Sequence, residues 1–386
     1  MLYKMNYEEY FKVKELFRSM DYQLDIESIF LKKRGQIFVD NRKMPQTACI
    51  YNDKHNFYIA GRVDNREFNQ NLYDYMTKHI FPSMLTTDCL DFYIDYGNQY
   101  LWKEEIRNIF EQNYVSSVDW RYYMLDKQKI TINLEVLPED YKLKRIDEEL
   151  LKRSELKNID DITEWTSTDG WLSQQDFLKN GFGFCIIKGK DIVSWSIADY
   201  VIGNSCEIGI ETDEDYRRKG FAAIVATACV KFALSNGIDR IGWHCFESNI
   251  ASQKTAEKIG FKLRKKYAPI FGWFNSFDNY LVQAYECYNN KNYIQASKLY
   301  ENAFLLIEHG SEEVKLSRIC NKNNKYWFYY NAARCHAHSG NDDLLFRRLR
   351  TSIELGLSNI DMIIKDDAFK VFEKTEEYNQ LLDKIR

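Results

Sequence analysis

The segment TDEDYRRKGFAA occupies residues 212–223 and joins a strand-like run to a long apolar run. The preceding residues CEIGIET alternate as in a β-strand, and the apolar run after Gly220 predicts a buried helix. Helix N-termini present unpaired N–H groups and the positive end of the helix dipole, and both attract anions. A glycine in that position lets a phosphate approach the backbone. Two interpretations fit: a phosphate-binding turn that uses Arg217, Arg218 and Lys219, or a surface turn with solvated charges.

This segment lies in the middle of three regions that differ in periodicity. Strand-like and helix-like runs follow the same order in the first and second regions, which predicts two mixed sheets, each covered by helices. The first region ends in the strand-like run VDWRYYML at residues 118–125, and the second is expected to contain helices at 146–156 and 173–179. The fold class is therefore α/β with an all-α C-terminal region. The predicted domains are 1–135, 136–276 and 277–386.

The C-terminal region contains two sets of positions with the same internal spacing. These positions are Tyr280, Ala284, Ala296, Tyr300 and Ala303 in the first set, and Tyr329, Ala333, Leu345, Leu349 and Ser352 in the second. The spacing is typical of a tetratricopeptide-type helix pair, although the second set begins later than a simple repeat of about 34 residues would place it. A plain helical bundle fits as well. Helical repeats bind peptides or proteins on concave surfaces, so a protein partner, a dimer contact and simple packing on a sheet edge all stay open.

Composition excludes several classes of function. The chain has 386 residues, 45% of them hydrophobic and 28% charged, and its net charge of -4 gives no general attraction to nucleic acid or anionic lipid. Its nine cysteines form no Cys-x-x-Cys pair and no Cys/His zinc spacing, so we expect neither a disulfide framework nor a metal site. The first residues lack the layout of a signal peptide and no run is long enough to span a membrane. A cytoplasmic protein without nucleic-acid or membrane partners is expected.

A second motif follows the opening segment in NIASQKTAEKIGF, residues 249–261. The opening segment matches Arg/Gln-x-x-Gly-x-Gly/Ala through Arg217, Gly220 and Ala222. The second matches Asn-x-x-Ser/Ala followed by Gly-Phe through Asn249, Ser252, Gly260 and Phe261. With both motifs in a strand-turn-helix-strand-helix order, residues 140–275 resemble the GNAT superfamily of acetyl-CoA-dependent N-acetyltransferases, in particular a bacterial branch of it.

The resemblance implies a GNAT fold, acetyl-CoA as the cofactor, and direct transfer of acetyl to a primary amine of a small molecule or a protein. The amides of residues 218–222 would bind the pyrophosphate, and the strand backbone at 210–212 would pair with the pantetheine arm. The cofactor-binding residues that it implies are Ile210, Glu211, Thr212, Arg217, Arg218, Lys219, Gly220, Phe221, Ala222, Asn249 and Ser252. The acceptor amine itself cannot be read from the sequence.

Candidate catalytic residues follow from strand alternation. Glu207 and Glu211 share one face of the strand CEIGIET and the isoleucines share the other, so both carboxylates are candidate general bases if the isoleucines face the core. The alternative is that both glutamates line a solvated sheet. Many GNAT enzymes place a tyrosine general acid where this chain has Ala256. The leaving thiolate would then take its proton from Ser252, Tyr267, His244 or water.

The first region lacks the phosphate-binding pattern. Its corresponding turn, AGRVDNREFNQ at residues 60–70, has no Arg-x-x-Gly-x-Gly/Ala sequence, and Asp64 and Glu67 would repel a phosphate. A degenerate, non-catalytic GNAT-like domain is therefore expected there. Two functions remain: an N-acetyltransferase, or a non-catalytic acyl-CoA-binding or interaction scaffold, which the alanine at Ala256 favours.

Overall fold

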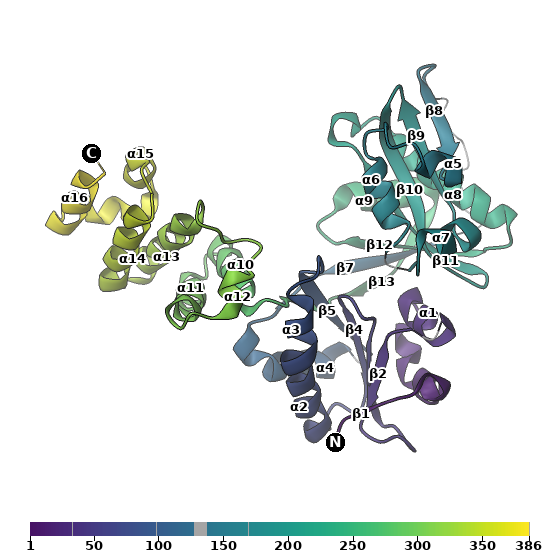
Figure 1. The fold of residues 1–386 in the computed structure, drawn as a ribbon, viewed down its shortest axis with the longest axis horizontal. Helices are drawn as coiled ribbons and strands as arrows, with labels where there is room; N and C mark the ends of the chain where they lie inside the picture. Colours follow the sequence, from purple (N-terminus) through teal and green to yellow (C-terminus); the bar gives the residue numbers. More distant parts are fainter. Residues whose placement is uncertain (33, 98, 127–136, 169, 386) are drawn as a thin grey trace. The chain divides into compact units, whose positions relative to one another are not determined.

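A computed structural model describes residues 1–386 apart from residues 33, 98, 127–136, 169 and 386. It contains two seven-stranded sheets with flanking helices and a helical C-terminal region, which confirms the α/β fold class (Figure 1). The chain divides into two compact units. The first comprises residues 1–65, 94–102 and 117–269, and the second comprises residues 66–93, 103–116 and 270–386.

The first sheet has the strand order β1-β2-β3-β4-β5-β14-β6. Its strands are β1 (Tyr3–Lys4), β2 (Gln36–Val39), β3 (Thr47–Tyr51), β4 (Asn56–Gly61), β5 (Asp91–Tyr96), β6 (Ser116–Ser117) and β14 (Ile270–Trp273). The α-helices of this part of the sequence are α1 (Leu24–Lys32), α2 (Arg66–Tyr75), α3 (Phe81–Met84) and α4 (Gln99–Ile109). The remaining helical segments are the 3₁₀ helices η1 (Tyr7–Met20) and η3 (Glu111–Asn113) and the π-helix η2 (Met76–Ile80).

The second sheet has the order β13-β7-β12-β11-β10-β9-β8 and lies within the first unit. Its strands are β7 (Trp120–Leu125), β8 (Tyr141–Arg145), β9 (Gly183–Lys188), β10 (Asp191–Ile202), β11 (Ser205–Thr212), β12 (Arg240–Phe246) and β13 (Phe261–Tyr267). Its helical segments are α5 (Glu148–Leu151), α6 (Ile159–Trp165), α7 (Gln174–Asn180), η5 (Glu214–Tyr216), α8 (Phe221–Ser235) and α9 (Ile250–Ile259). Strands β11 and β12 are parallel while the other pairs are antiparallel, so the sheet is mixed.

Each sheet contains one strand that the sequence assigned to the other region. Strand β7 belongs to the run at residues 118–125 of the first region, but it pairs between β12 and β13 of the second sheet. Strand β14, at the end of the predicted second domain, lies between β5 and β6 of the first sheet. The order of predicted elements did not show this exchange, because neighbours in a sheet are set by long-range pairing. The division into domains at 135 and 276 stays a prediction.

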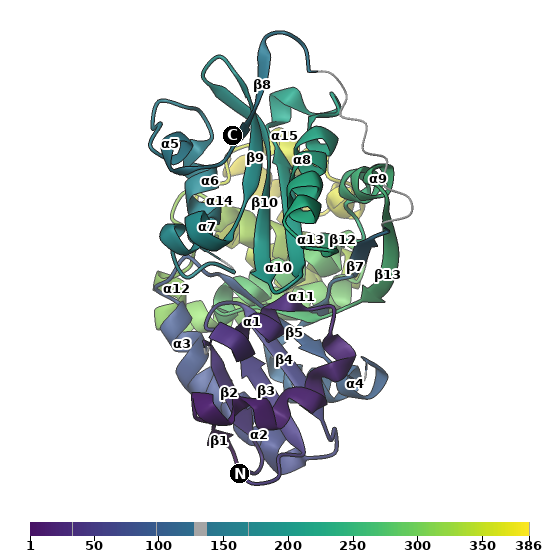
Figure 2. The ribbon, with the colours of Figure 1, turned by 90° about the vertical axis from the view of Figure 1, so that its right-hand side faces the viewer.

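The core of the second sheet fixes the position of the opening segment. Helix α8 is Ala-rich and apolar on nearly all sides, as expected of a helix buried against a sheet. Its Ala226, Cys229 and Val230 pack in one cluster with Ile208 of β11. Figure 2 shows α8 alongside strand β10 of this sheet. Because α8 is held in this way, its N-terminus at Phe221 lies at the end of the turn that follows β11.

One helix prediction differs from the structure. The predicted helix at 146–156 is the short α5, which begins after Asp147, whose side chain accepts from the Leu150 amide at 2.9 Å. The chain then turns and α6 begins after Asn158, which has a left-handed φ of 68°. The sequence did not predict α6. Its last residue, Trp165, donates from the indole to Asp199 at 2.6 Å and lies over Gly209 of β11.

The C-terminal region is helical, as predicted. Its segments are α10 (Ser276–Asn289), α11 (Tyr293–Glu308), α12 (Glu312–Lys315), α13 (Lys325–Ser339), α14 (Asp342–Glu354), α15 (Ile360–Ile364), η6 (Asp367–Phe372) and α16 (Glu376–Asp383). Helices α10 and α11 pack together, as do α13 and α14, and the two sets of equally spaced positions are buried in these pairs, apart from the partly buried Tyr280. The tetratricopeptide interpretation stays a prediction. None of the helices in the described ranges combines the length and apolarity that a bilayer span requires.

Candidate active site

Strands β11 and β12 part at a defined point. Their parallel ladder runs from Ser205–Arg240 to Glu207–Gly242, and in the described chain it does not continue beyond that pair. The carbonyls of Gly209 and Glu211 accept hydrogen bonds from Ser196 and Ser194 of β10. Because backbone groups of successive strand residues point in opposite directions, those of Ile208 and Ile210 point away from β10. The edge of β11 beyond Glu207 is therefore open to an extended ligand.

The turn after β11 is fastened by its acidic half. Asp213 accepts from the Asp215 amide at 3.1 Å, and its other carboxylate oxygen lies 2.9 Å from the Lys157 ammonium and 2.8 Å from the Asn158 amide. The hydrogen bond from Lys157 holds the pKa of Asp213 below its usual range, and Asn158 adds to this effect. The acidic residue thus pairs with a neighbouring segment instead of neutralising the basic residues that follow it.

The basic half of the turn leaves its backbone donors unpaired. Arg218 and Gly220 both have left-handed φ values, 64° and 81°, and α8 begins at the next residue, Phe221. The amides of residues 218–222 have no hydrogen-bond acceptor within the described chain. Unpaired amides at a helix N-terminus form an anion-binding site. The geometry therefore favours the phosphate-binding interpretation of this turn over the solvated one.

A cavity of about 670 Å³ lies between this turn and α9. Its lining residues are Ile210, Glu211, Thr212, Tyr216, Arg217, Arg218, Gly220, Phe221, Ala222, Ala223, Asn249, Ala251, Ser252, Lys254, Thr255 and Lys258. Every predicted cofactor-binding residue is among them except Lys219. The Lys219 ammonium donates to the Asp215 carbonyl at 3.0 Å and lies 4.6 Å from the centre of the Tyr216 ring. Cofactor binding by any of these residues stays a prediction.

Several lining residues were not singled out from the sequence. Ala251, Lys254, Thr255 and Lys258 belong to α9 and share one helical face, because they recur at intervals of three and four residues. A helix was predicted after Asn249, and its periodicity would have identified that face. The two lysines bring positive charge to the side of the cavity opposite the basic turn.

The residues at the start of α9 have structural partners. The Asn249 side chain accepts from the Ser252 amide at 3.0 Å and caps the helix. The Ser252 hydroxyl accepts from the Trp243 indole at 3.0 Å, which leaves its own proton for another acceptor. Ala256 is fully buried in the core. The position of the usual tyrosine is therefore occupied by a buried methyl group.

The two candidate bases have different surroundings. Strand alternation places Glu207 and Glu211 on the same face, and Ile208 is buried in the core on the other, as predicted. Glu211 is exposed at the cavity rim, and partial burial of its carboxyl together with Asp161 raises its pKa. Glu207 is 8% exposed and lies where β11 and β12 part. Strand alternation predicted the face of both glutamates but not the burial of Glu207.

Segments distant in sequence cover Glu207. Its Oε1 accepts from the Leu24 amide at the start of α1 at 3.2 Å and lies 3.4 Å from Nε2 of His244. A Cβ at Gly242 would lie 3.0 Å from the Tyr122 ring and 3.1 Å from Cγ of Glu207, so the glycine makes room for both side chains. Burial raises the pKa of Tyr122 to about 12, and the Glu207 charge adds to the effect.

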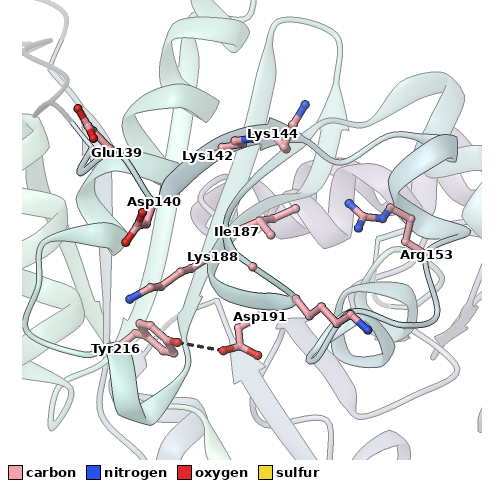
Figure 3. A pocket seen from close by; sticks show the side chains of 11 residues that line it. Glu139, Asp140, Lys142, Lys144, Arg153, Ile187, Lys188, Asp191 and Tyr216 are labelled. Atoms are coloured by element: carbon pink, nitrogen blue, oxygen red, sulfur yellow. Dashed lines mark hydrogen bonds between the residues drawn. The ribbon is translucent and has the colours of Figure 1, made fainter.

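A second cavity of about 920 Å³ lies beside the basic turn (Figure 3). It is lined by Glu139, Asp140, Lys142, Lys144, Arg153, Ile187, Lys188, Gly189, Lys190, Asp191 and Tyr216. Tyr216 lines both cavities and donates to Asp191 at 3.0 Å. Charges of both signs are mixed along this surface, so it selects neither anions nor cations.

Comparisons with known proteins agree with this geometry. The GNAT acetyltransferase family profile matches residues 14–270, more than half of the chain. The uncharacterized N-acetyltransferase YdfB of Bacillus subtilis (strain 168) is 28% identical over 235 residues, which cover 60% of this chain and 84% of that protein. The uncharacterized N-acetyltransferase YjdG of the same organism is 41% identical over 124 residues, which cover 28% of this chain and 74% of that protein.

Solved structures support the same fold. A GCN5-related N-acetyltransferase-like protein from Streptococcus suis 89/1591 aligns with a TM-score of 0.52 and 22% identity, covering 69% of this chain and 98% of that one. A GCN5-related N-acetyltransferase from Sphaerobacter thermophilus aligns with a TM-score of 0.51 and 10% identity, covering 71% and 95%. The chain belongs to the GNAT acetyltransferase family.

Proposed function

We propose that the chain transfers acetyl from acetyl-CoA directly to a primary amine of a small molecule or a protein. The observation that carries this proposal is the meeting of an open β11 edge with the unpaired amides of residues 218–222 in one cavity. The amides suit a pyrophosphate, and the edge suits the amide-containing pantetheine arm, which can pair like an added strand. Arg217, Arg218, Lys254 and Lys258 supply charge that complements the cofactor phosphates.

Glu207 is the proposed general base. The donor contributes an activated acetyl thioester, and the acceptor amine must lose a proton before or during its attack on the acetyl carbon. Glu207 lies at the end of the β11–β12 ladder, where the thioester of an inserted cofactor would end, whereas Glu211 lies farther along the open edge. Its carboxylate would take the proton from the amine. Glu211 remains the alternative base.

Ser252 is the proposed donor to the leaving sulfur. As the amine attacks, the carbon–sulfur bond breaks and the thiolate leaves with the electron pair. Ser252 lines the cavity, and its hydroxyl accepts from Trp243 and lies beside the Cys245 thiol, so its proton would turn from that thiol to the leaving sulfur. Tyr267 suits the role less well, because its buried hydroxyl is hydrogen-bonded to Nδ1 of His244 and the residue is not among those that line the cavity. Buried Ala256 cannot contribute.

Binding and turnover test the proposal in two steps. Acetyl-CoA at ~100 times its Kd should raise the free energy of unfolding by about 2.7 kcal/mol, seen as an increase in Tm. ATP at the same concentration controls for non-specific phosphate binding. Release of free thiol is then measured across an amine panel of polyamines, amino sugars, amino acids and lysine peptides. Absence of any Tm shift with both acetyl-CoA and CoA would contradict the proposal.

A non-catalytic acyl-CoA-binding scaffold is the second candidate. The specific observation in its favour is the buried alanine at position 256, since the usual phenol is missing. A Tm shift with acetyl-CoA but no thiol release with any amine in the panel would favour the scaffold. Thiol release that depends on both an amine and Glu207 would exclude it.

A further inference from the structure

His244 has two hydrogen-bonding partners and one neighbouring carboxylate that together fix how its ring is protonated. Its Nε2 lies 3.2 Å from the Tyr22 carbonyl oxygen and 3.4 Å from Oε1 of Glu207. Its Nδ1 lies 2.8 Å from the Tyr267 hydroxyl. The side chains of His244 and Glu207 are only 13% and 11% exposed, so water competes little for these contacts.

The chemistry of these partners assigns the proton on Nε2. A carbonyl oxygen and a carboxylate oxygen can only accept hydrogen bonds, so Nε2 between Tyr22 and Glu207 must carry the hydrogen. In the neutral ring Nδ1 is then the acceptor, and the Tyr267 hydroxyl donates to it. Tyr267 is well placed to keep its proton, because burial raises its pKa.

Aromatic side chains fix the plane of the imidazole. The Tyr122 ring stacks on it, with centroids 4.7 Å apart and planes at 30°. The Tyr267 ring meets it edge-on at 5.7 Å and 87°. Tyr122 comes from the exchanged strand β7 and Tyr267 from β13, so the ring of His244 is held by residues from two other strands of the sheet.

Oε1 of Glu207 accepts one hydrogen bond and has the imidazole of His244 beside it. The Leu24 amide, at 3.2 Å, and Nε2 of His244, at 3.4 Å, both approach Oε1. The other oxygen, Oε2, has no hydrogen-bond partner among the described residues. A carboxylate anchored through one oxygen presents the other in a fixed direction.

We infer that His244 is the positioning residue of Glu207. Its Nε2–H is hydrogen-bonded to the Tyr22 carbonyl and lies beside Oε1, with Nε2 3.4 Å from that oxygen, Tyr267 fixes its tautomer, and Oε2 takes the proton from the acceptor amine. This inference rests on the proposed function, in which Glu207 is the base. The N–H bond of the amine breaks and an O–H bond forms on Oε2, while His244 keeps its own proton throughout.

The first test detects the tautomer and needs no turnover. In full-length protein with 15N-labelled histidine at pH 8, where an ordinary imidazole is neutral, we expect His244 to carry its hydrogen on Nε2. The signal is assigned by its absence in His244→Gln. Glu207→Gln should shift the Nε2 resonance, whereas Glu211→Gln, the matched control on the same strand face, should not. A hydrogen on Nδ1 alone, or a resonance unaffected by Glu207→Gln, would overturn the inference.

The second test separates positioning from folding. The amide nitrogen of a glutamine can reach the place of Nε2, whereas that of an asparagine reaches only the place of Nδ1. His244→Gln should therefore retain at least tenfold more kcat than His244→Asn, with the KM for acetyl-CoA and the Tm shift on cofactor binding within about twofold of native in both. Equal losses of kcat in the two variants would contradict a positioning role.

Failure of the proposed function and failure of the inference about His244 give different results. A chain that binds acetyl-CoA and acetylates no amine contradicts the proposed function, and the tautomer measurement then still decides whether His244 holds Glu207. A chain that turns over normally with His244→Asn supports the proposed function and overturns the inference.

Discussion

The strand-to-helix turns after β4 and after β11 use their charges in opposite ways. In the turn after β4, the Arg62 guanidinium forms two hydrogen bonds of 3.1 Å with Asp64, and it also donates to Gln46 at 3.0 Å. In the turn after β11, Asp213 pairs with Lys157 from another segment. In the first turn the arginine is therefore paired with the aspartate of the same turn. In the second turn the aspartate pairs outside the turn, and Arg217, Arg218 and the adjacent amides face a cavity.

This difference shows that a strand-to-helix turn can either form a phosphate-binding site or lack one. Both turns contain arginine and aspartate, so composition does not separate them. What separates them is the partner of the aspartate and the two left-handed residues, Arg218 and Gly220, that turn successive amides toward one place. Arg217 does contact Glu214 at 3.2 Å, but both side chains are exposed, and such pairs exchange readily with a ligand.

Reversing the charge of the second turn should produce the largest effect. In the double variant Arg217→Glu, Arg218→Glu, two carboxylates would face the cofactor phosphates, and the stabilisation of about 2.7 kcal/mol expected from acetyl-CoA should disappear. Arg62→Glu is the matched control, because it removes an arginine from the other turn. It should leave the acetyl-CoA Tm shift unchanged. A normal shift in the double variant would refute the assignment of the turn.

Removing the base should be the next largest effect, and it acts on kcat alone. Glu207→Gln keeps the shape of the side chain but cannot accept the amine proton, so kcat should fall about 10²- to 10⁴-fold. The Tm shift with acetyl-CoA should be unchanged. Glu211→Gln should lower kcat by less than about tenfold if Glu207 is the base. The reverse ranking, measured by thiol release with the best amine of the panel, would move the role to Glu211.

The lysines of α9 should make a smaller contribution to cofactor affinity. Replacing Lys254 and Lys258 together by alanine removes two charges from the cavity wall, at about 0.2–1 kcal/mol for each exposed ion pair. Acetyl-CoA affinity should fall about fivefold, and the loss should shrink as salt is raised. Lys262, on β13 and paired with Asp126, is the matched control and should have no effect on replacement by alanine. A loss independent of salt would contradict the electrostatic explanation.

The sequence predicted the parts of the site that lie close together along the chain. The segment from Ile210 to Ala222 and the residues Asn249 and Ser252 meet at one cavity because each motif is short and each follows a strand. Strand alternation correctly placed Glu207 opposite Ile208. The side chain of Lys219 was beyond prediction, since its contact with Tyr216 depends on the local backbone of the turn.

What the sequence could not give depends on long-range pairing. Neither the exchange of β7 and β14 nor the cover of Leu24 over Glu207 follows from any local pattern, because the partners are set by the whole sheet. His244 was one of several candidates for protonating the thiolate. In the structure its Nε2–H points to the Tyr22 carbonyl oxygen. Two of its neighbours, Tyr22 and Tyr122, come from the first third of the chain, which no local pattern could indicate.

The smallest expected effect concerns Asp213 and tests whether its pairing with Lys157 holds the second turn in place for cofactor binding. Asp213→Asn keeps a side-chain oxygen that can accept from the Asp215 amide but loses the charge that pairs with Lys157. With the turn less firmly held, acetyl-CoA affinity should fall about two- to fivefold. Asp64→Asn in the first turn also removes an aspartate whose pKa is lowered, there by Arg62, but it should leave cofactor affinity unchanged.

Both substitutions should share one dependence of stability on pH. Because Lys157 lowers the pKa of Asp213 in the folded chain, its stabilising contribution is present above the unfolded-state pKa of about 3.9 and is lost as the pH falls through the lower folded value. The Tm difference between native protein and Asp213→Asn should therefore be constant from pH 7 to pH 5 and shrink as the pH falls below about 3.9. Asp64→Asn should follow the same course. If only Asp213→Asn also weakens acetyl-CoA binding, cofactor binding belongs to the second turn although both aspartates stabilise the fold in the same way; if both substitutions weaken it, the cofactor is not confined to the second turn.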